Sequence, residues 1–251
     1  MGLSSNIIWH QTDINGLKAI LSSKCFLCSY SLETIQWNTA HVKRAFPMIS
    51  FCNIPISDLE EYLTNNKDGK YSGKYGKYTI GLKHSWATKN GIAPVWYLNK
   101  QASCLQEIMQ YHSRLMLENW TDFENLAWRL LSNIKNYEGE LIKYGFKSYR
   151  FYDEKEIRYV PDLQILQNLN VQPVLDEKGY ENYKKQNKKS ALIEDVFLPF
   201  EIEDISYILV SNANQTKRLK ELLGDNKDKV TILSYTSIIE DIIGKCHTRK
   251  K

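Results

Sequence analysis

The sequence lacks any long hydrophobic run. Its mean hydropathy is -0.45, and no apolar stretch approaches the ~20 residues that a helix needs to span a bilayer. Residues 1–6 also lack the basic and apolar regions of a secretory signal peptide. These absences argue against a membrane protein and predict a cytoplasmic location.

The five cysteines form neither a disulfide framework nor a metal site by their spacing. Their number is odd and they are scattered along the chain, so we expect reduced thiols. The one close pair, Cys25 and Cys28, has no second Cys or His pair at the spacing of zinc ligands. We therefore predict no metal, and we interpret this pair as part of a strand or turn in the core.

Several catalytic motifs are missing as well. The chain contains no Gly-x-x-x-x-Gly-Lys-Ser/Thr loop, no dinucleotide fingerprint, no Gly-x-Ser-x-Gly elbow and no His-Glu-x-x-His pair. Their absence argues against the common NTPases, Rossmann enzymes, hydrolases and zinc proteases. The charge is a weak guide, because 33 basic and 29 acidic residues give a net charge of +4. Such a charge permits a nucleic-acid partner without requiring one.

Apolar residues follow a strand period in some segments and a helical period in others. The expected strands cover residues 7–10, 46–52, 78–82, 94–98, 149–160, 205–210 and 230–233. Helices are expected after the capping residues Thr12 and Asp13, twice within residues 101–135, and over residues 214–223 and 235–243. This order predicts a mixed protein in which strands and helices alternate.

Two polar segments interrupt the pattern. Residues 64–77 combine Gly, Asn and Lys with tyrosines, which predicts a mobile loop. Residues 176–190 are rich in Lys, Asn and Glu, which predicts a solvated surface excursion. We expect one domain over residues 1–251, with a strand–helix–strand–helix segment over residues 205–243.

The most informative run lies in the strand expected at residues 149–160. A period of two places Glu154, Glu156 and Arg158 on one face of that strand. The two carboxylates repel each other unless a cation, a shared proton or a substrate group compensates them, and Arg158 supplies only part of that compensation. Paired carboxylates suit glycosyl transfer, because negative charge stabilises an oxocarbenium-like transition state. The alternative is a polar edge strand whose charges pair along the surface.

Two further side chains are candidates for ligand binding. His10 lies at the end of the first expected strand, beside Thr12, where it could hydrogen-bond a ribose or a phosphate. Tyr78 enters the strand after the Gly- and Lys-rich segment, where it could stack on a heteroaromatic ring. The alternatives are a structural histidine and ordinary packing of the tyrosine in the core.

Six sequence blocks follow one another between residues 7 and 161. They are Trp9-His10-Gln11-Thr12, Tyr30-Ser31-Leu32-Glu33, the segment from Pro47 to Pro55, the segment from Tyr75 to Leu82, Pro94-Val95 with Tyr97-Leu98, and the segment from Phe151 to Pro161. In this order they resemble the AbiGi family of bacterial abortive phage-infection proteins. The resemblance implies phage defence within a toxin–antitoxin-like operon, where the family carries an antitoxin label.

The layout of these blocks is also similar to the ADP-ribosyltransferase superfamily. That similarity implies an α+β fold with a split, mainly antiparallel β core flanked by helices, and NAD as the substrate. By position, His10 would hold the NAD ribose, Tyr78 would stack on nicotinamide and Glu156 would bind the nicotinamide-ribose 2′-hydroxyl. Ser50-Phe51-Cys52 resembles the middle strand of another branch, which makes Ser50 an alternative to Tyr78. Glu154 resembles the first Glu of the Glu-x-Glu pair in that branch, which orients the acceptor.

Taken together, these features predict an NAD-dependent ADP-ribosyltransferase that acts as a toxin-like antiphage effector. Glu156 would stabilise the cationic sugar, Glu154 would position or deprotonate the acceptor, and His10 and Thr12 would anchor the donor. Replacing Glu156 by Gln is expected to abolish activity and to leave the fold intact.

Two alternatives stay open. The chain could be a non-enzymatic antitoxin or phage-sensing protein that binds a partner, or an NAD glycohydrolase in which water is the acceptor. The expected partners are NAD, a macromolecular acceptor that is RNA, DNA or protein, and a toxin or antitoxin protein from the same operon. No membrane partner is expected.

Overall fold

The computed structural model describes residues 5–56, 58–59, 78–111, 122–141, 146–188, 190–210 and 213–235. The chain divides into two compact units, the first built from residues 1–25, 51–91 and 199–251 and the second from residues 26–50 and 92–198. Strand β3 (Ala40–Cys52) runs from the second unit into the first. The single domain expected over residues 1–251 stays a prediction.

The first unit is a sheet with helices. Its elements are β1 (Ile7–Thr12), α1 (Ile14–Ser23), β4 (Tyr78–Lys83), α3 (His84–Lys89), η4 (Ile202–Asp204), β13 (Ile205–Val210), α8 (Ala213–Leu223), η5 (Gly224–Asn226) and β14 (Thr231–Ser234). Strand β4 pairs antiparallel with both β1 and β13, and β13 pairs parallel with β14. Helix α8 supplies the crossover that a parallel pair requires.

Helix α1 begins where the sequence predicts. The side chain of Asp13 accepts a 2.7 Å hydrogen bond from the backbone N–H of Gly16 and so caps the helix. Leu17 and Leu21, four residues apart, form its buried face. The helix ends at Lys24, whose φ of 52° is left-handed.

The core of the first unit gathers around Trp9. This side chain packs with a cluster of buried residues comprising Cys52, Ile54, Leu59, Leu209 and Tyr235. Its indole N–H donates a 2.8 Å hydrogen bond to the carbonyl of Ile54, which satisfies the one polar atom of a buried ring. Gly81 lies opposite Trp9 in the β1–β4 pair, and a Cβ on Gly81 would lie 2.5 Å from the Trp9 ring. Glycine at this position therefore permits the close approach of Trp9.

The second unit contains the rest of the described strands and helices. Its elements are β2 (Cys25–Trp37), most of β3, β5 (Ala93–Pro94), β6 (Trp96–Leu98), α4 (Ser103–Tyr111), α5 (Asp122–Ser132), β7 (Ile134–Asn136), β8 (Gly139–Leu141), β9 (Phe146–Tyr149), η3 (Phe151–Glu154), β10 (Glu156–Tyr159), α6 (Leu163–Asn168), β11 (Leu175–Asp176), α7 (Glu177–Gln186) and β12 (Leu192–Pro199).

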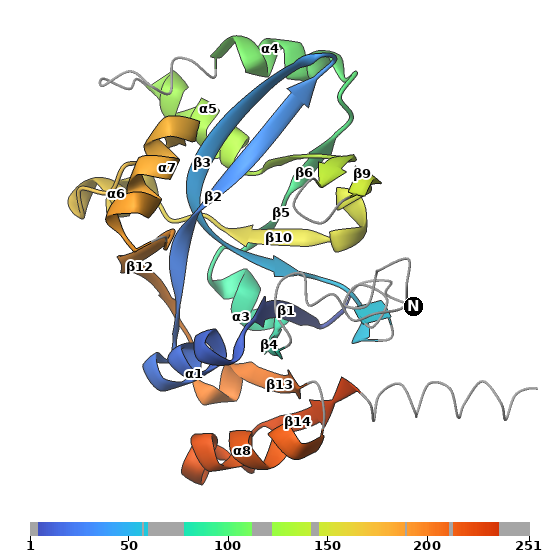
Figure 1. Cartoon of the computed structure of the whole chain (residues 1–251), viewed down its shortest axis with the longest axis vertical. Coiled ribbons are helices and arrows are strands. Elements are labelled where there is room, and N and C mark those ends of the chain that lie inside the picture. Colours follow the sequence, from blue (N-terminus) through green and yellow to red (C-terminus); the bar gives the residue numbers. More distant parts are fainter. Residues whose placement is uncertain are drawn as a thin grey trace, which may run out of the picture. The chain divides into compact units, whose positions relative to one another are not determined.

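Strands β2 and β3 form the long hairpin of this unit, seen as paired blue arrows in Figure 1. Their antiparallel register runs from Ser29 opposite Met48 to Trp37 opposite Ala40. Strand β12 pairs with β2, whereas β10 and β11 pair with β3, and β5 pairs with β10. Two short pairs lie apart from this sheet, the parallel pair β6–β7 and the antiparallel pair β8–β9.

The continuous strand predicted at residues 149–160 is wrong. Strand β9 ends at Tyr149, a 3-10 turn covers Phe151–Glu154, and strand β10 begins only at Glu156. Between the turn and β10, Lys155 has a φ of 45°, which is left-handed and breaks the alternation of faces. Glu154 and Glu156 therefore lie on different elements.

The polar segment at residues 176–190 is largely helical. Asp176 caps α7 with a 2.6 Å hydrogen bond from the backbone N–H of Gly179, and no residue of this helix is buried. The segment predicted as a loop at residues 64–77 lies outside the described residues, and so does the helix predicted at residues 235–243 beyond Tyr235. Strand β13, helix α8 and strand β14 occupy residues 205–234.

The α+β class predicted from the sequence is confirmed. The strands pair mainly antiparallel, as in β1–β4, β2–β3 and β4–β13, and helices accompany them in both units. Among the helices of the described ranges, none has the length and apolar character needed to cross a membrane.

Candidate active site

Two buried carboxylates mark the candidate site in the second unit. Glu154 ends the 3-10 turn η3 and is 3% exposed, and Glu156 starts strand β10 and is 5% exposed. Carboxylates are seldom buried unless they are paired, so their partners decide what this site can do.

Arg158 is the first partner of Glu156. The two residues are two positions apart on β10, so their side chains share one face of the strand. The Arg158 guanidinium donates from Nε to Oε1 of Glu156 at 2.7 Å and from Nη2 to Oε2 at 3.2 Å, a bidentate contact. It also contacts Oε1 of Glu33 at 2.8 Å and the carbonyl of Ser132 at 2.8 Å. The predicted pairing of Glu156 with Arg158 is therefore present.

Lys135 on strand β7 joins the two carboxylates. Its Nζ lies 2.8 Å from Oε2 of Glu154 and 2.5 Å from Oε2 of Glu156. The Lys135 side chain is 13% exposed, so solvent screens these contacts little. This lysine supplies the compensation that Arg158 alone does not give.

Ser50 brings a hydroxyl to Glu156 from strand β3. Its Oγ donates a 2.8 Å hydrogen bond to Oε1 of Glu156, although Ser50 itself is exposed. The backbone N–H of Glu156 donates a 2.7 Å hydrogen bond to the hydroxyl of Tyr97 on β6. Both the backbone and the carboxylate of Glu156 are therefore held by side chains of other strands.

The charges of this cluster keep Glu156 ionised. Burial alone would raise the pKa of Glu156, but the positive charges of Arg158 and Lys135 outweigh burial and hold that pKa far below its usual range. Burial likewise opposes the charge of Lys135, yet Glu156 and Glu154 raise the pKa of this lysine well above its usual value. With Glu33, three carboxylates face two cations, which leaves one negative charge in excess.

Aromatic rings lie beside the carboxylates. Tyr152 stacks on Tyr137 with ring centroids 5.3 Å apart, and the Nζ of Lys155 lies 3.3 Å from the Tyr152 ring centroid. Burial, followed by the charge of Glu154 and a hydrogen bond to it, raises the pKa of Tyr149. This border offers flat apolar faces next to charged groups.

The structure brings three of the predicted site residues together in the second unit. Ser50, Glu154 and Glu156 belong to one hydrogen-bonded cluster, with Lys135 between the carboxylates. The prediction that Glu154, Glu156 and Arg158 lie close together is confirmed. They do not share one face of a single strand, because Glu154 belongs to the turn η3. The catalytic and binding roles of these residues stay predictions.

The other three predicted residues belong to the first unit. Thr12 lies directly opposite Tyr78 in the β1–β4 pair, and Tyr78 is 8% exposed. His10 is partly buried, and its ring centroid lies 5.6 Å from that of Phe51. Their predicted roles in NAD binding are likewise untested by this geometry.

Sequence reasoning missed Lys135, Glu33 and Tyr97. The only signal was the expectation that two neighbouring carboxylates need a further cation. Lys135 stands in the three-residue strand Ile134–Asn136, and nothing in its spacing distinguishes it from the other lysines.

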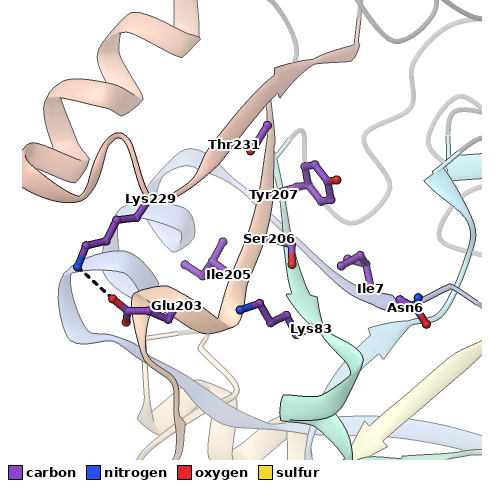
Figure 2. A pocket seen from close by; sticks show the side chains of 9 residues that line it. All are labelled: Asn6, Ile7, Lys83, Glu203, Ile205, Ser206, Tyr207, Lys229 and Thr231. Atoms are coloured by element: carbon purple, nitrogen blue, oxygen red, sulfur yellow. Dashed lines mark hydrogen bonds and ion pairs between the residues drawn. The ribbon is translucent and has the colours of Figure 1, made fainter.

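A separate open groove of about 740 Å3 lies in the first unit, and Figure 2 shows the residues that line it. At one side, Lys229 and Glu203 form an ion pair of 3.0 Å. The hydrogen bond from Lys229 lowers the pKa of Glu203. The lining also includes Lys83, Tyr207 and Thr231, so it mixes basic, aromatic and hydroxyl groups.

Comparisons with known proteins point to one family. The model of the family described as "Putative abortive phage resistance protein AbiGi, antitoxin" matches residues 24–211. A curated relative, "Abortive phage resistance protein AbiGi" from Lactococcus lactis subsp. cremoris, is 27% identical over 221 residues, which cover 77% of this chain and 85% of the relative.

Solved structures of DarT from Thermus sp. 2.9 are similar at a low level. The complex of that protein with NAD+ has a TM-score of 0.37 at 11% identity and covers 91% of this chain and 95% of that chain. Its complex with carba-NAD+ has a TM-score of 0.36 at 10% identity, with coverages of 91% and 94%. TM-scores this low establish no shared fold.

Proposed function

Since this chain belongs to the AbiGi family of abortive phage-resistance proteins, we propose that it acts in the cytoplasm as an antiphage ADP-ribosyltransferase with NAD as its donor. The acceptor in this proposal is a macromolecule, either RNA, DNA or protein. The same operon would supply a toxin or antitoxin partner protein.

One observation carries the proposal: Glu156 is a buried, ionised carboxylate that accepts a hydrogen bond from the exposed residue Ser50. In ADP-ribosyl transfer the bond between ribose C1′ and the nicotinamide nitrogen breaks, and its electron pair stays with nicotinamide. The ribose carbon becomes cationic, and a fixed negative charge stabilises it most in a water-poor site. The excess negative charge of the cluster fits that requirement.

In this proposal each residue of the site has its own role in the reaction. Glu156 stabilises the cationic sugar, and the acceptor oxygen or nitrogen bonds to C1′ while its proton passes to Glu154. His10 and Thr12 anchor the donor. The hydrogen bond from Ser50 to Glu156 supports Ser50 as the middle-strand residue of the site, whereas Tyr78 has only its place opposite Thr12 in its favour.

A second candidate function is a non-enzymatic antitoxin that binds a partner toxin. Oε1 of Glu156 accepts from Ser50 and Arg158, and Oε2 accepts from Lys135 and Arg158. A carboxylate offers about four acceptor positions, so the protein itself occupies all of them. In the enzyme, a substrate hydroxyl must therefore displace one of these donors, and exposed Ser50 is the accessible one.

Labelled NAD distinguishes the two functions. The protein is incubated with NAD labelled in its ADP-ribose part and with lysate from phage-infected cells, and the products are digested separately with nuclease and with protease. We expect the natural protein to transfer label to a macromolecule. In Glu156→Asp the rate of transfer should fall at least ~100-fold, because the shorter side chain keeps the negative charge but holds it farther from the sugar.

The matched control is Glu177→Asp, which alters a surface carboxylate paired with Lys43 at 2.6 Å in the same unit. That variant should transfer label normally. Free ADP-ribose without labelled macromolecule would assign a glycohydrolase. Absence of NAD turnover in every lysate, with capture of a partner toxin, would assign the binding antitoxin instead.

A further inference from the structure

Lys135 holds the carboxylate of Glu156, and Tyr97 holds its backbone N–H. The two residues lie opposite each other in the parallel β6–β7 pair. The Tyr97 hydroxyl accepts from the backbone N–H of Glu156 at 2.7 Å, and Lys135 Nζ donates to its carboxylate at 2.5 Å. A single register pair thus fixes both the backbone and the side chain of Glu156.

Lys135 also fixes the separation of the carboxylates. Its Nζ contacts Oε2 of Glu154 and Oε2 of Glu156, so the two oxygens lie on either side of one ammonium group. The ring of Phe151, in the turn that carries Glu154, lies with its centroid 5.1 Å from that ammonium. Elements β7, η3 and β10 therefore meet at this nitrogen atom.

Arg158 does not duplicate this arrangement. Its guanidinium donates to Glu156, to Glu33 on β2 and to the carbonyl of Ser132 on α5. Lys135 instead connects Glu154 with Glu156.

We propose that Lys135 is a positioning residue that keeps Glu154 and Glu156 both ionised and at a fixed separation; this inference rests on the proposed function for its effect on NAD. Within the part of the chain that the structure describes, the charged and titratable groups facing the pair are Lys135 on β7, Arg158 on β10, Glu33 on β2, Tyr97 on β6 and Tyr149 on β9. Lys135 and Arg158 are the cations of this group. Without Lys135 the two carboxylates repel each other, and one of them takes up a proton at a higher pH.

The first experiment does not depend on enzymatic activity. The carboxyl carbons of the glutamates are followed by NMR from pH 3 to pH 8 (about the range in which carboxylates titrate in proteins) in the natural protein and in Lys135→Met. In Lys135→Met we expect one new titration at least ~1 pH unit above the ordinary range of Glu, removed again by Glu154→Gln in the same chain. Lys135→Arg keeps the positive charge and should not show it.

The second experiment follows the pH profile of NAD turnover. The acid limb of kcat should move upward by about one pH unit or more in Lys135→Met, with a smaller change in KM for NAD. Lys43→Met removes a lysine of the same unit that pairs with Glu177 on the surface, and it should leave the profile unchanged.

The outcomes separate the two proposals. If the natural protein turns over no NAD but Lys135→Met shows the raised titration, the proposed function fails and the role of Lys135 stands. If folded Lys135→Met shows no raised titration, the role of Lys135 is wrong. If Lys135→Met does not fold, the double variant that combines Lys135→Met with Glu154→Gln is tested. A folded double variant supports the role of Lys135, and an unfolded one contradicts it.

Discussion

Ser50 donates a 2.8 Å hydrogen bond to Oε1 of Glu156, although 106 positions of the chain separate the two residues. Ser50 is exposed, whereas Glu156 is 5% exposed. The serine hydroxyl therefore lies at the solvent edge of an enclosed carboxylate.

Replacing Ser50 by Ala should separate binding from stability. The change removes a hydrogen bond to a buried, ionised carboxylate, so the free energy of unfolding should fall by about 1.5–3 kcal/mol. If Ser50 helps to hold NAD, KM for NAD should rise several-fold, which steady-state kinetics measures. Ser31→Ala is the matched control, because Ser31 donates to Glu33 at 3.3 Å, a carboxylate of the same cluster. Unchanged kinetics in a stable Ser50→Ala protein would remove Ser50 from the site.

Local sequence signals predicted the elements of the first unit well. The strand expected at residues 78–82 is β4, the strand expected at residues 205–210 is β13, and Asp13 caps α1. In each case the signal is contained in a few neighbouring residues, namely an alternation of apolar side chains or a capping side chain before a helical period.

The site was less predictable because it depends on contacts distant in sequence. The aromatic and β-branched residues of 149–160 favour a strand, but Lys155 takes a left-handed conformation and Glu154 belongs to a turn. Lys135 reaches both carboxylates because of the position of β7 in the fold, which no local sequence pattern indicates. Helix α7 is mostly polar and buries none of its residues, so its hydrophobic signal in the sequence was weak.

Arg158→Met should destabilise the protein strongly. The Arg158 side chain is fully buried, and its loss leaves Glu156 and Glu33 short of a counter-charge. Removing one partner of a buried ion pair costs about 3–5 kcal/mol in the free energy of unfolding, which denaturant titration measures. Arg129→Met provides the same substitution at an ion pair with Asp162 whose side chains are 57% and 66% exposed, and it should cost less than ~1 kcal/mol. Equal costs would show that the cluster around Arg158 is not tightly coupled.

The protein should lose stability in acid through Glu156. Its pKa is lowered on folding, so its ionised form stabilises the folded state above the ordinary value of 4.5, and this contribution is lost as the pH falls through the lower folded pKa. Glu156→Gln should therefore lower the free energy of unfolding near neutral pH, and the expectation from sequence that its fold stays intact stays a prediction. The difference in free energy of unfolding between the natural protein and Glu156→Gln should shrink as the pH falls below 4.5.

Denaturant titrations at several pH values test this dependence on Glu156. Glu177→Gln alters a surface carboxylate, and its cost should stay below ~1 kcal/mol at every pH. A difference for Glu156→Gln that does not depend on pH would mean that the ionisation of Glu156 contributes nothing to stability.

His10→Ala should weaken the binding of NAD more than it slows the chemical step. His10 lies on β1 and is partly buried against Phe51, so its removal leaves a small gap and should cost less than the ~3–5 kcal/mol of truncating a large core side chain. An anchor of the donor acts on the bound ground state as well as on the transition state. Its loss therefore raises KM for NAD with a smaller fall in kcat, whereas Glu156→Asp chiefly lowers kcat. Calorimetry with NAD measures the affinity directly. If His10→Ala binds NAD as tightly as the natural protein does, or fails to fold, His10 is a structural histidine and the first strand no longer supports the transferase.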